Sequence, residues 1–295
     1  MAQIRPRRSA LYMPGSNERA LEKGKSLAAD VIIFDLEDAV APEMKQQARD
    51  QVQDALRAGG YGTKELVIRV NGLETPWFAD DLKSAISAGP DAILVPKIST
   101  ARDVNDIRTA LADANAPKEL DVWAMMETPL AMLNALEIAA SGPNEIYGLQ
   151  AFVMGTNDLA KETGAALKPG RMPMLAWLST CVAAARAFDI QILDGVYNDF
   201  KDEAGFKTEC EQGRDLGMNG KTLIHPNQLA PCNEIFSPSK EDVDWSQKII
   251  NAFRQAENQD KGAITVEGKM VELLHKSMAE QTVAIATAIE DNKQD

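Results

Sequence analysis

Two carboxylates follow apolar runs in this sequence, at positions where they could do chemistry. Glu127 follows the run at residues 122–126, and Asp158 follows the run at 152–154 through Gly155. Apolar runs of this length indicate buried strands, and α/β proteins carry their chemistry at the carboxyl ends of such strands. Two carboxylates on neighbouring strand ends suit a hard divalent cation that keeps positions open for a substrate. The alternative is that each acid caps the helix that follows it.

Ionisable side chains follow seven of the eight apolar runs. They are Asp35, Glu37, Asp38, Arg69, Lys97, Glu127, Asp158, Asp194 and His225. Because the carboxyl ends of parallel strands meet on one rim, we expect a catalytic mouth there. Asp194 and His225 are also compatible with structural roles. Lys97 would form a Schiff base only if it were desolvated. Because a pair of metal-binding carboxylates is expected nearby, we favour a role in which Lys97 neutralises the charge of an anion.

The elements that must position these residues alternate between strand and helix. The predicted strands are residues 9–14, 31–38, 66–71, 92–97, 122–127, 151–155, 190–194 and 221–226. Helices are predicted after Ser16 or Asn17, which can cap the first of them, and over 47–56, 76–87, 104–111, 130–140, 173–188 and 208–216. Eight alternations with short connections favour an α/β fold, a closed (β/α)8 TIM barrel, over an open sheet.

Composition limits the classes of protein that fit. A net charge of −13 argues against general nucleic-acid binding, which needs a basic face. No apolar stretch is long enough for a membrane span, and the first residues lack the apolar core of a signal peptide. The cysteines, Cys181, Cys210 and Cys232, are widely spaced and fit a reducing compartment. We therefore expect a cytoplasmic protein without a membrane or nucleic-acid partner.

Basic residues are concentrated in the first 25 residues of this acidic chain. They are Arg5, Arg7, Arg8, Arg19, Lys23 and Lys25. Such a cluster suits a small molecule that carries phosphate groups. The alternative is an ordinary solvated group of charges.

Several sequence blocks, in the same order, resemble the citrate lyase β-subunit and malyl-CoA lyase family. They are RSALYMPG (8–15), DLEDAVAP (35–42), IRVNG (68–72), VPK (95–97), ETP (127–129), GTNDL (155–159) and GKTLIHP (220–226). The resemblance covers roughly residues 5–275. It implies a magnesium-dependent carbon–carbon lyase on a TIM barrel, with Mn²⁺ as a possible substitute. The implied substrate is a 3-hydroxyacyl thioester of malyl-CoA or citramalyl-CoA type, cleaved to acetyl-CoA and a 2-oxo acid such as glyoxylate or pyruvate.

The resemblance also implies roles for individual residues. Glu127 and Asp158 would hold the metal, and Arg69 would meet the carboxylate or carbonyl of the substrate. Glu37 and Asp38 would order the waters of the metal, and Arg19 and Lys23 would meet the phosphates of CoA. The remaining substrate-binding residues would be Gly155, Thr156 and Asn157.

The last segment extends beyond what a closed barrel needs. We expect the barrel to occupy residues 1–236 and a helical extension to occupy 237–295, with helices near 243–256 and 271–289 and an exposed turn or hairpin at 262–268. The resemblance implies a homotrimer or hexamer in which this extension places Glu272 over the active site of a neighbouring subunit. The family has Asp at this position, and Glu keeps the charge but adds a methylene.

Three kinds of function are compatible with these features. The first is the carbon–carbon lyase, either on acyl-CoA or as a citrate lyase β subunit acting on citryl-acyl carrier protein. The second is a hydrolase, a malyl-CoA thioesterase that uses the same metal site and an activated water. The third is a non-catalytic acyl-CoA-binding subunit.

Overall fold

The protein folds into two compact units. The computed structural model describes residues 5–143, 145–258 and 260–292. One unit spans Arg7–Phe236, and the other contains the segment that begins at Ser237. Within the described ranges, no helix combines the length and the apolar character needed to cross a membrane.

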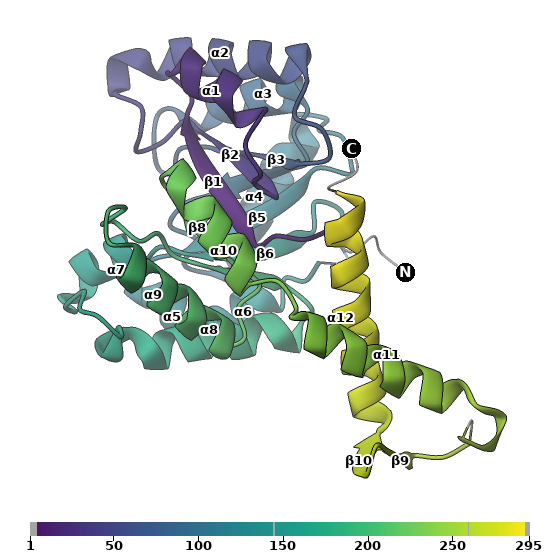
Figure 1. Ribbon diagram of the computed structural model, residues 1–295. Coiled ribbons are helices and arrows are strands. Elements are labelled where there is room, and N and C mark those ends of the chain that lie inside the picture. Colours follow the sequence, from purple (N-terminus) through teal and green to yellow (C-terminus); the bar gives the residue numbers. More distant parts are fainter. Residues whose placement is uncertain (1–4, 144, 259, 293–295) are drawn as a thin grey trace. The chain divides into compact units, whose positions relative to one another are not determined.

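Eight parallel strands close the Arg7–Phe236 unit into a barrel (Figure 1). The strands are β1 (Ser9–Pro14), β2 (Val31–Asp35), β3 (Glu65–Arg69), β4 (Ala92–Val95), β5 (Asp121–Met126), β6 (Leu149–Met154), β7 (Gln191–Asp194) and β8 (Gly220–Leu223). Each strand pairs with the next one along the chain, and β8 pairs with β1. The predicted (β/α)8 barrel is therefore confirmed.

Helices follow the strands of the barrel. They are α1 (Glu18–Gly24), α2 (Lys45–Ala58), α3 (Phe78–Ala88), α4 (Ala101–Asp113), α5 (Pro129–Leu133), α6 (Ala135–Ala139), α7 (Thr156–Thr163), α8 (Leu175–Ala187), α9 (Glu203–Asp215) and α10 (Leu229–Ile235). The side chain of Asn17 caps α1, as the sequence predicts. The prediction of one helix over 130–140 is wrong. Asn134 interrupts it, and its side-chain amide donates to the carbonyl of Ser99 at 3.0 Å.

Alternation along the strands separates two apolar layers. One buried cluster contains strand residues only, among them Val31 and Ile33 of β2 and Leu193 of β7, and it fills the inside of the barrel. Ile32 and Phe34 belong to the larger cluster, which also includes helix residues. Successive side chains of a strand point to opposite sides of the barrel wall. A strand's last residue therefore faces the barrel mouth only if it lies an even number of positions after a residue that points into the barrel; we call this its parity.

The segment that begins at Ser237 forms its own small core. Its elements are α11 (Lys240–Arg254), β9 (Ala263–Val266), β10 (Lys269–Glu272) and α12 (Leu273–Asp291). β9 and β10 pair as an antiparallel hairpin. Ile249 and Phe253 of α11 are buried in one cluster with Ile264 and Val271 of the hairpin and Ala279 of α12. The two helices and the hairpin predicted for this segment are therefore confirmed.

Asp194 does not join the residues of the barrel mouth. Its neighbour Leu193 faces the inside of the barrel, so Asp194 has the opposite parity. Its carboxylate accepts hydrogen bonds from Arg171 Nη1 at 2.6 Å and from Lys221 Nζ at 2.9 Å, and all three side chains are buried. Although burial opposes the charge, the two cations hold the pKa of Asp194 below its usual value. The structural role that the sequence left open for Asp194 is the one that it has.

We expect Asp194→Asn to destabilise the protein by about 3 to 5 kcal/mol, because two buried cations would lose their main counter-charge. Since the pKa of Asp194 is lowered, its stabilisation is present above the unfolded-state pKa and is lost as the pH falls through the folded-state value. Urea unfolding at several pH values should show the difference between variant and wild type shrinking in acid. Asp215→Asn, which changes an exposed ion pair with Arg214, is the control and should change stability little. A neutral effect of Asp194→Asn at pH 7 would contradict the assigned role.

Candidate active site

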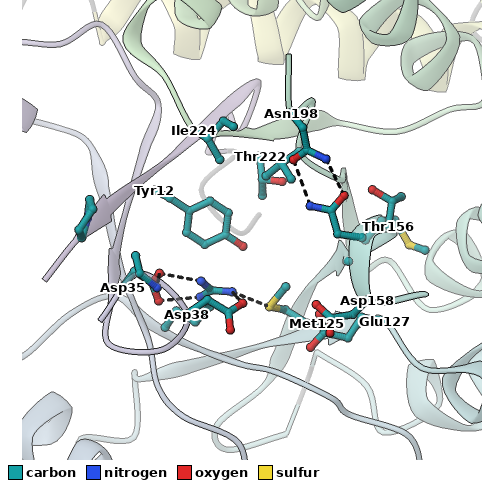
Figure 2. Close-up of a pocket in the computed structure, with 17 residues that line it drawn as sticks. Tyr12, Asp35, Asp38, Met125, Glu127, Thr156, Asp158, Asn198, Thr222 and Ile224 are labelled. Carbon is teal, nitrogen blue, oxygen red and sulfur yellow. Dashed lines mark hydrogen bonds and ion pairs between the residues drawn. The ribbon is translucent and has the colours of Figure 1, made fainter. Parts of the chain in front are cut away.

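A cavity of about 380 Å³ lies at the carboxyl ends of the barrel strands (Figure 2). The structure brings together there these predicted site residues: Asp35, Asp38, Arg69, Glu127, Gly155, Thr156, Asn157 and Asp158. The sequence did not single out the other residues that line it: Tyr12, Pro14, Ala39, Met125, Met154, Val196, Asn198, Thr222 and Ile224. Strand alternation is the signal for two of these, because Tyr12 lies two residues after Ala10 and Met125 two residues after Trp123, both inside the barrel.

Glu127 is held rigidly although it lies at the end of a strand. Its side chain is buried, and Oε1 accepts the backbone N–H of Lys97 at 2.8 Å. It does not cap the next helix, because the hydroxyl of Thr128 caps α5. A Cβ atom at Gly155 would overlap the Glu127 side chain, so only glycine leaves room for this carboxylate. Burial and the charge of Asp158 raise the pKa of Glu127 to about 7, against the hydrogen bond from Lys97.

Asp158 lies in the first turn of α7, a helix that the sequence analysis did not predict. Gly155 is the N-cap of α7, so Asp158 does not cap that helix either. Lys97 Nζ lies 3.9 Å from Asp158 Oδ1. The lysine side chain is 51% exposed, which is not the desolvated setting that a Schiff-base lysine needs. Lys97 is therefore placed to balance charge at the rim.

The residues at this rim fit Mg²⁺. Glu127 and Asp158 repel one another, as the raised pKa of Glu127 reflects, and a cation would relieve that repulsion. Among the described residues, no cluster of three or more histidines, cysteines or acids could form an all-protein cage. Mg²⁺ needs no such cage, because it binds through one or two carboxylates together with water and substrate oxygens. Glu127 and Asp158 are the residues that would hold it.

Arg69 lines the cavity from the end of β3 and is fixed by carboxylates. Its Nε and Nη2 donate to the two oxygens of Asp35 at 2.7 and 2.6 Å, which is a bidentate pair. Its Nη1 lies 2.9 Å from Glu37 Oε2 and 3.4 Å from Asp38 Oδ2. Three carboxylates therefore share one guanidinium group, and Asp35, to which the sequence analysis gave no separate role, orients it.

Glu37 and Asp38 differ in their surroundings. Glu37 lies against Arg69 and is not among the residues that line the cavity, whereas Asp38 lines it and is exposed. Burial raises the pKa of Glu37 to about 8 although the charge of Arg69 lowers it, and the negative charge of Asp38 adds to the rise.

The remaining predicted residues do not line this cavity. Arg19 and Lys23 are exposed side chains on α1. Glu272 belongs to the other unit, where it ends β10 and its N–H donates to His275 Nδ1 at 2.9 Å. His225 Nδ1 accepts the N–H of Asn227 at 3.2 Å, and its ring stacks on Phe200, so its contacts are those of a turn residue.

Gly155→Ala should weaken Mg²⁺ binding without changing any charge, because the added methyl group would displace the Glu127 carboxylate. We expect at least about a tenfold rise in the dissociation constant for Mg²⁺, measured by calorimetry, since displacing one ligand costs on the order of 1 to 2 kcal/mol. Gly72→Ala is the control, because a Cβ there meets its nearest atom at 3.8 Å. Unchanged Mg²⁺ affinity in Gly155→Ala would remove Glu127 from the metal site.

The chain is similar to known proteins over most of its length. Residues 8–226 match the profile of the HpcH/HpaI aldolase/citrate lyase family, and residues 168–289 match that of the carbon–carbon bond lyases of the TIM-barrel fold. The chain is 50% identical to the (3S)-malyl-CoA thioesterase of Cereibacter sphaeroides, with 97% of each chain covered. It is 31% identical to the mitochondrial citramalyl-CoA lyase of Homo sapiens, with 97% of this chain and 87% of the relative covered.

A solved structure extends the likeness to three dimensions. Protein CitE of Mycobacterium tuberculosis, in complex with magnesium, acetoacetate and coenzyme A, superimposes with a TM-score of 0.72. The two sequences are 27% identical, and the match covers 96% of this chain and 98% of CitE. Sequence blocks, barrel and relatives agree: the chain belongs to the HpcH/HpaI aldolase/citrate lyase family.

Proposed function

We propose that the protein hydrolyses the thioester of a malyl-CoA-type substrate to malate and free CoA. The observation that carries this proposal is the 50% identity, over nearly the whole of both chains, to a relative named (3S)-malyl-CoA thioesterase. The named lyases share less of the sequence, with 31% identity for the human citramalyl-CoA lyase and 33% for the citrate lyase β subunit of Escherichia coli.

The proposal assigns each part of such a substrate to residues in or near the cavity. Mg²⁺ (or Mn²⁺) bound there would supply a positive charge for the carboxylate and hydroxyl groups of the substrate and would polarise the oxygen atoms that it contacts. Glu127 and Asp158 would hold the ion, and Lys97 would balance the remaining charge at the rim. Arg69, which Asp35 orients, lines the cavity from β3. Exposed Arg19 and Lys23 on α1 meet the phosphates of CoA, and the main chain and side chains of residues 155–157 contact the acyl part.

The second candidate is the carbon–carbon lyase. It is favoured by the match of residues 168–289 to the carbon–carbon bond lyases. In that reaction the same metal and acyl group serve, but the bond to the α-carbon of the thioester breaks and gives acetyl-CoA and a 2-oxo acid. A binding subunit without catalysis is the third outcome that an experiment has to separate.

One assay distinguishes these outcomes. In the presence of Mg²⁺, the protein is incubated with each of three substrates in turn: (3S)-malyl-CoA, (3R)-malyl-CoA and citramalyl-CoA. Free thiol and 2-oxo acid are measured in each incubation. We expect free thiol and malate from one malyl-CoA isomer without glyoxylate. Activity should vanish in EDTA, return with Mg²⁺ or Mn²⁺, and be lost in Glu127→Ala and Asp158→Ala but not in the control Glu119→Ala, an exposed acid. Glyoxylate or pyruvate as product would assign the lyase reaction, and CoA binding without any product would assign the binding role.

The extension takes part in this function through an oligomer. Its unit leaves large apolar side chains exposed, namely Met270, Leu273, Leu274 and Met278. Exposed apolar side chains this close together are typical of a surface that another subunit covers. The proposed assembly is a homotrimer or hexamer in which Glu272 of one chain completes the active site of its neighbour.

Mixing two inactive variants tests the shared site. Glu272→Ala and Glu127→Ala chains should each lack turnover alone and should recover part of it after subunit exchange, because some hybrid sites contain neither change. Fluorescence transfer between labelled chains shows whether exchange has taken place. No recovery after exchange, or a fully active monomer, would contradict the shared site.

A further inference from the structure

Tyr12 is the tyrosine of this protein that stands inside the active-site cavity. It lies on β1, and Figure 2 shows its ring pointing into the cavity. The guanidinium carbon of Arg69 lies 4.7 Å from the centre of the ring, a cation–π contact that fixes the ring plane. The ring also packs on the apolar cluster inside the barrel. Tyr12 is therefore held on two sides while its hydroxyl faces the cavity.

The hydroxyl of Tyr12 differs from those of the other three tyrosines. Tyr61 donates to the carbonyl of Leu21 at 3.0 Å, Tyr147 to that of Ala116 at 2.9 Å, and Tyr197 to a carboxylate at 2.7 Å. Within the part of the chain that the structure describes, the Tyr12 hydroxyl has no hydrogen-bond partner. The phenol is half-buried and its hydroxyl opens onto the binding cavity, which leaves it free to bond an atom of a ligand bound there.

That ligand atom must be an acceptor. Burial is the main cause that raises the pKa of Tyr12; the charge of Arg69 opposes the rise, and those of Asp35, Glu127 and Glu37 add to it, so the phenol keeps its proton at neutral pH. The hydroxyl therefore acts as a donor and does not serve as a base. Two other donors at the cavity are engaged by the protein itself: Arg69 binds its carboxylates, and Thr222 donates to the carbonyl of Asp194 at 2.9 Å.

The acceptors of the proposed substrate divide between the two sides of the cavity. Its carboxylate and hydroxyl groups belong to the metal side, at Glu127 and Asp158, which leaves the carbonyl oxygen of the thioester. We propose that the Tyr12 hydroxyl donates a hydrogen bond to this carbonyl oxygen and is thereby a catalytic residue. The inference rests on the proposed substrate and applies to hydrolysis or lyase cleavage, because the same oxygen carries the developing negative charge in both.

In hydrolysis the step is balanced without an external reagent. A water oxygen bonds to the thioester carbon, and the electron pair of the C=O bond moves to the oxygen that Tyr12 faces. The C–S bond then breaks, CoA leaves as the thiol with one proton of the water, and the acid product releases the other. Tyr12 keeps its own proton throughout and stabilises the oxyanion, whose hydrogen bond is stronger than that of the ground-state carbonyl.

Tyr12→Phe removes the hydroxyl and keeps the ring that packs on Arg69. Loss of one donor to an oxyanion lowers kcat by about 10² to 10³, and we expect such a loss with KM and Mg²⁺ affinity nearly unchanged. Tyr61→Phe is the matched control, because it removes a hydroxyl that is bonded to the main chain outside the cavity. Wild-type kcat in Tyr12→Phe would overturn the proposal.

A binding measurement tests the same contact without turnover. The probes are two stable malyl-CoA analogues: a ketone in which CH₂ replaces the thioester sulfur, and a thioether that lacks the carbonyl group. Tyr12→Phe should lower the affinity for the ketone by about two- to tenfold, which corresponds to the loss of one neutral hydrogen bond, and should leave the affinity for the thioether unchanged. Equal effects on both analogues, or none on either, would overturn the role of Tyr12. If the wild-type protein binds the ketone but hydrolyses no thioester, the proposed hydrolysis fails while this comparison still decides the role of Tyr12.

Discussion

Closure of the barrel is the constraint on which the rest of the Arg7–Phe236 unit depends. The last strand must pair with the first, and Lys221 N–H donates to the carbonyl of Arg8 at 3.0 Å where they meet. A side chain at Gly220 would overlap the main chain of Arg7 and Arg8, so glycine is needed for this approach. Closure leaves no free strand edge, and it brings eight carboxyl ends, far apart in the chain, around one cavity.

The chemistry of that cavity follows from an excess of carboxylates over cationic side chains in a site that is partly buried from solvent. Asp35, Glu37 and Asp38 share Arg69, and the negative charges of Glu127 and Asp158 act on one another, with the exposed Lys97 3.9 Å from Asp158. Burial penalises each negative charge, which is why the pKa values of Glu37 and Glu127 rise to about 8 and 7. Such a site favours a bound cation at Glu127 and Asp158. On the neighbouring strands β1 to β3, Asp35 holds Arg69 in one orientation, and Arg69 holds the ring of Tyr12.

The same residue types serve stability elsewhere in the barrel. Asp194 ends β7 as Asp35 ends β2, but Asp194 is enclosed by Lys221 and Arg171 and does not face the cavity. Parity explains the difference: Ile33 and Leu193 both point into the barrel, and Asp35 lies two residues after the first whereas Asp194 lies one residue after the second. An acid at a strand end therefore faces the cavity or joins a buried ion cluster according to its side of the barrel wall.

The sequence by itself determined the alternation of eight strands and helices, and with it the barrel, because apolar periodicity and turn residues are local properties. It also placed Arg69, Glu127, Gly155 and Asp158 at strand ends that meet in one cavity. The tertiary structure decided what depends on contacts across the chain. It paired Arg69 with Asp35, enclosed Asp194 in a structural ion cluster, divided residues 130–140 at Asn134 and left the Tyr12 hydroxyl facing the cavity. Hydrogen-bond partners are chosen only when distant strands come together, so no local pattern in the sequence specifies them.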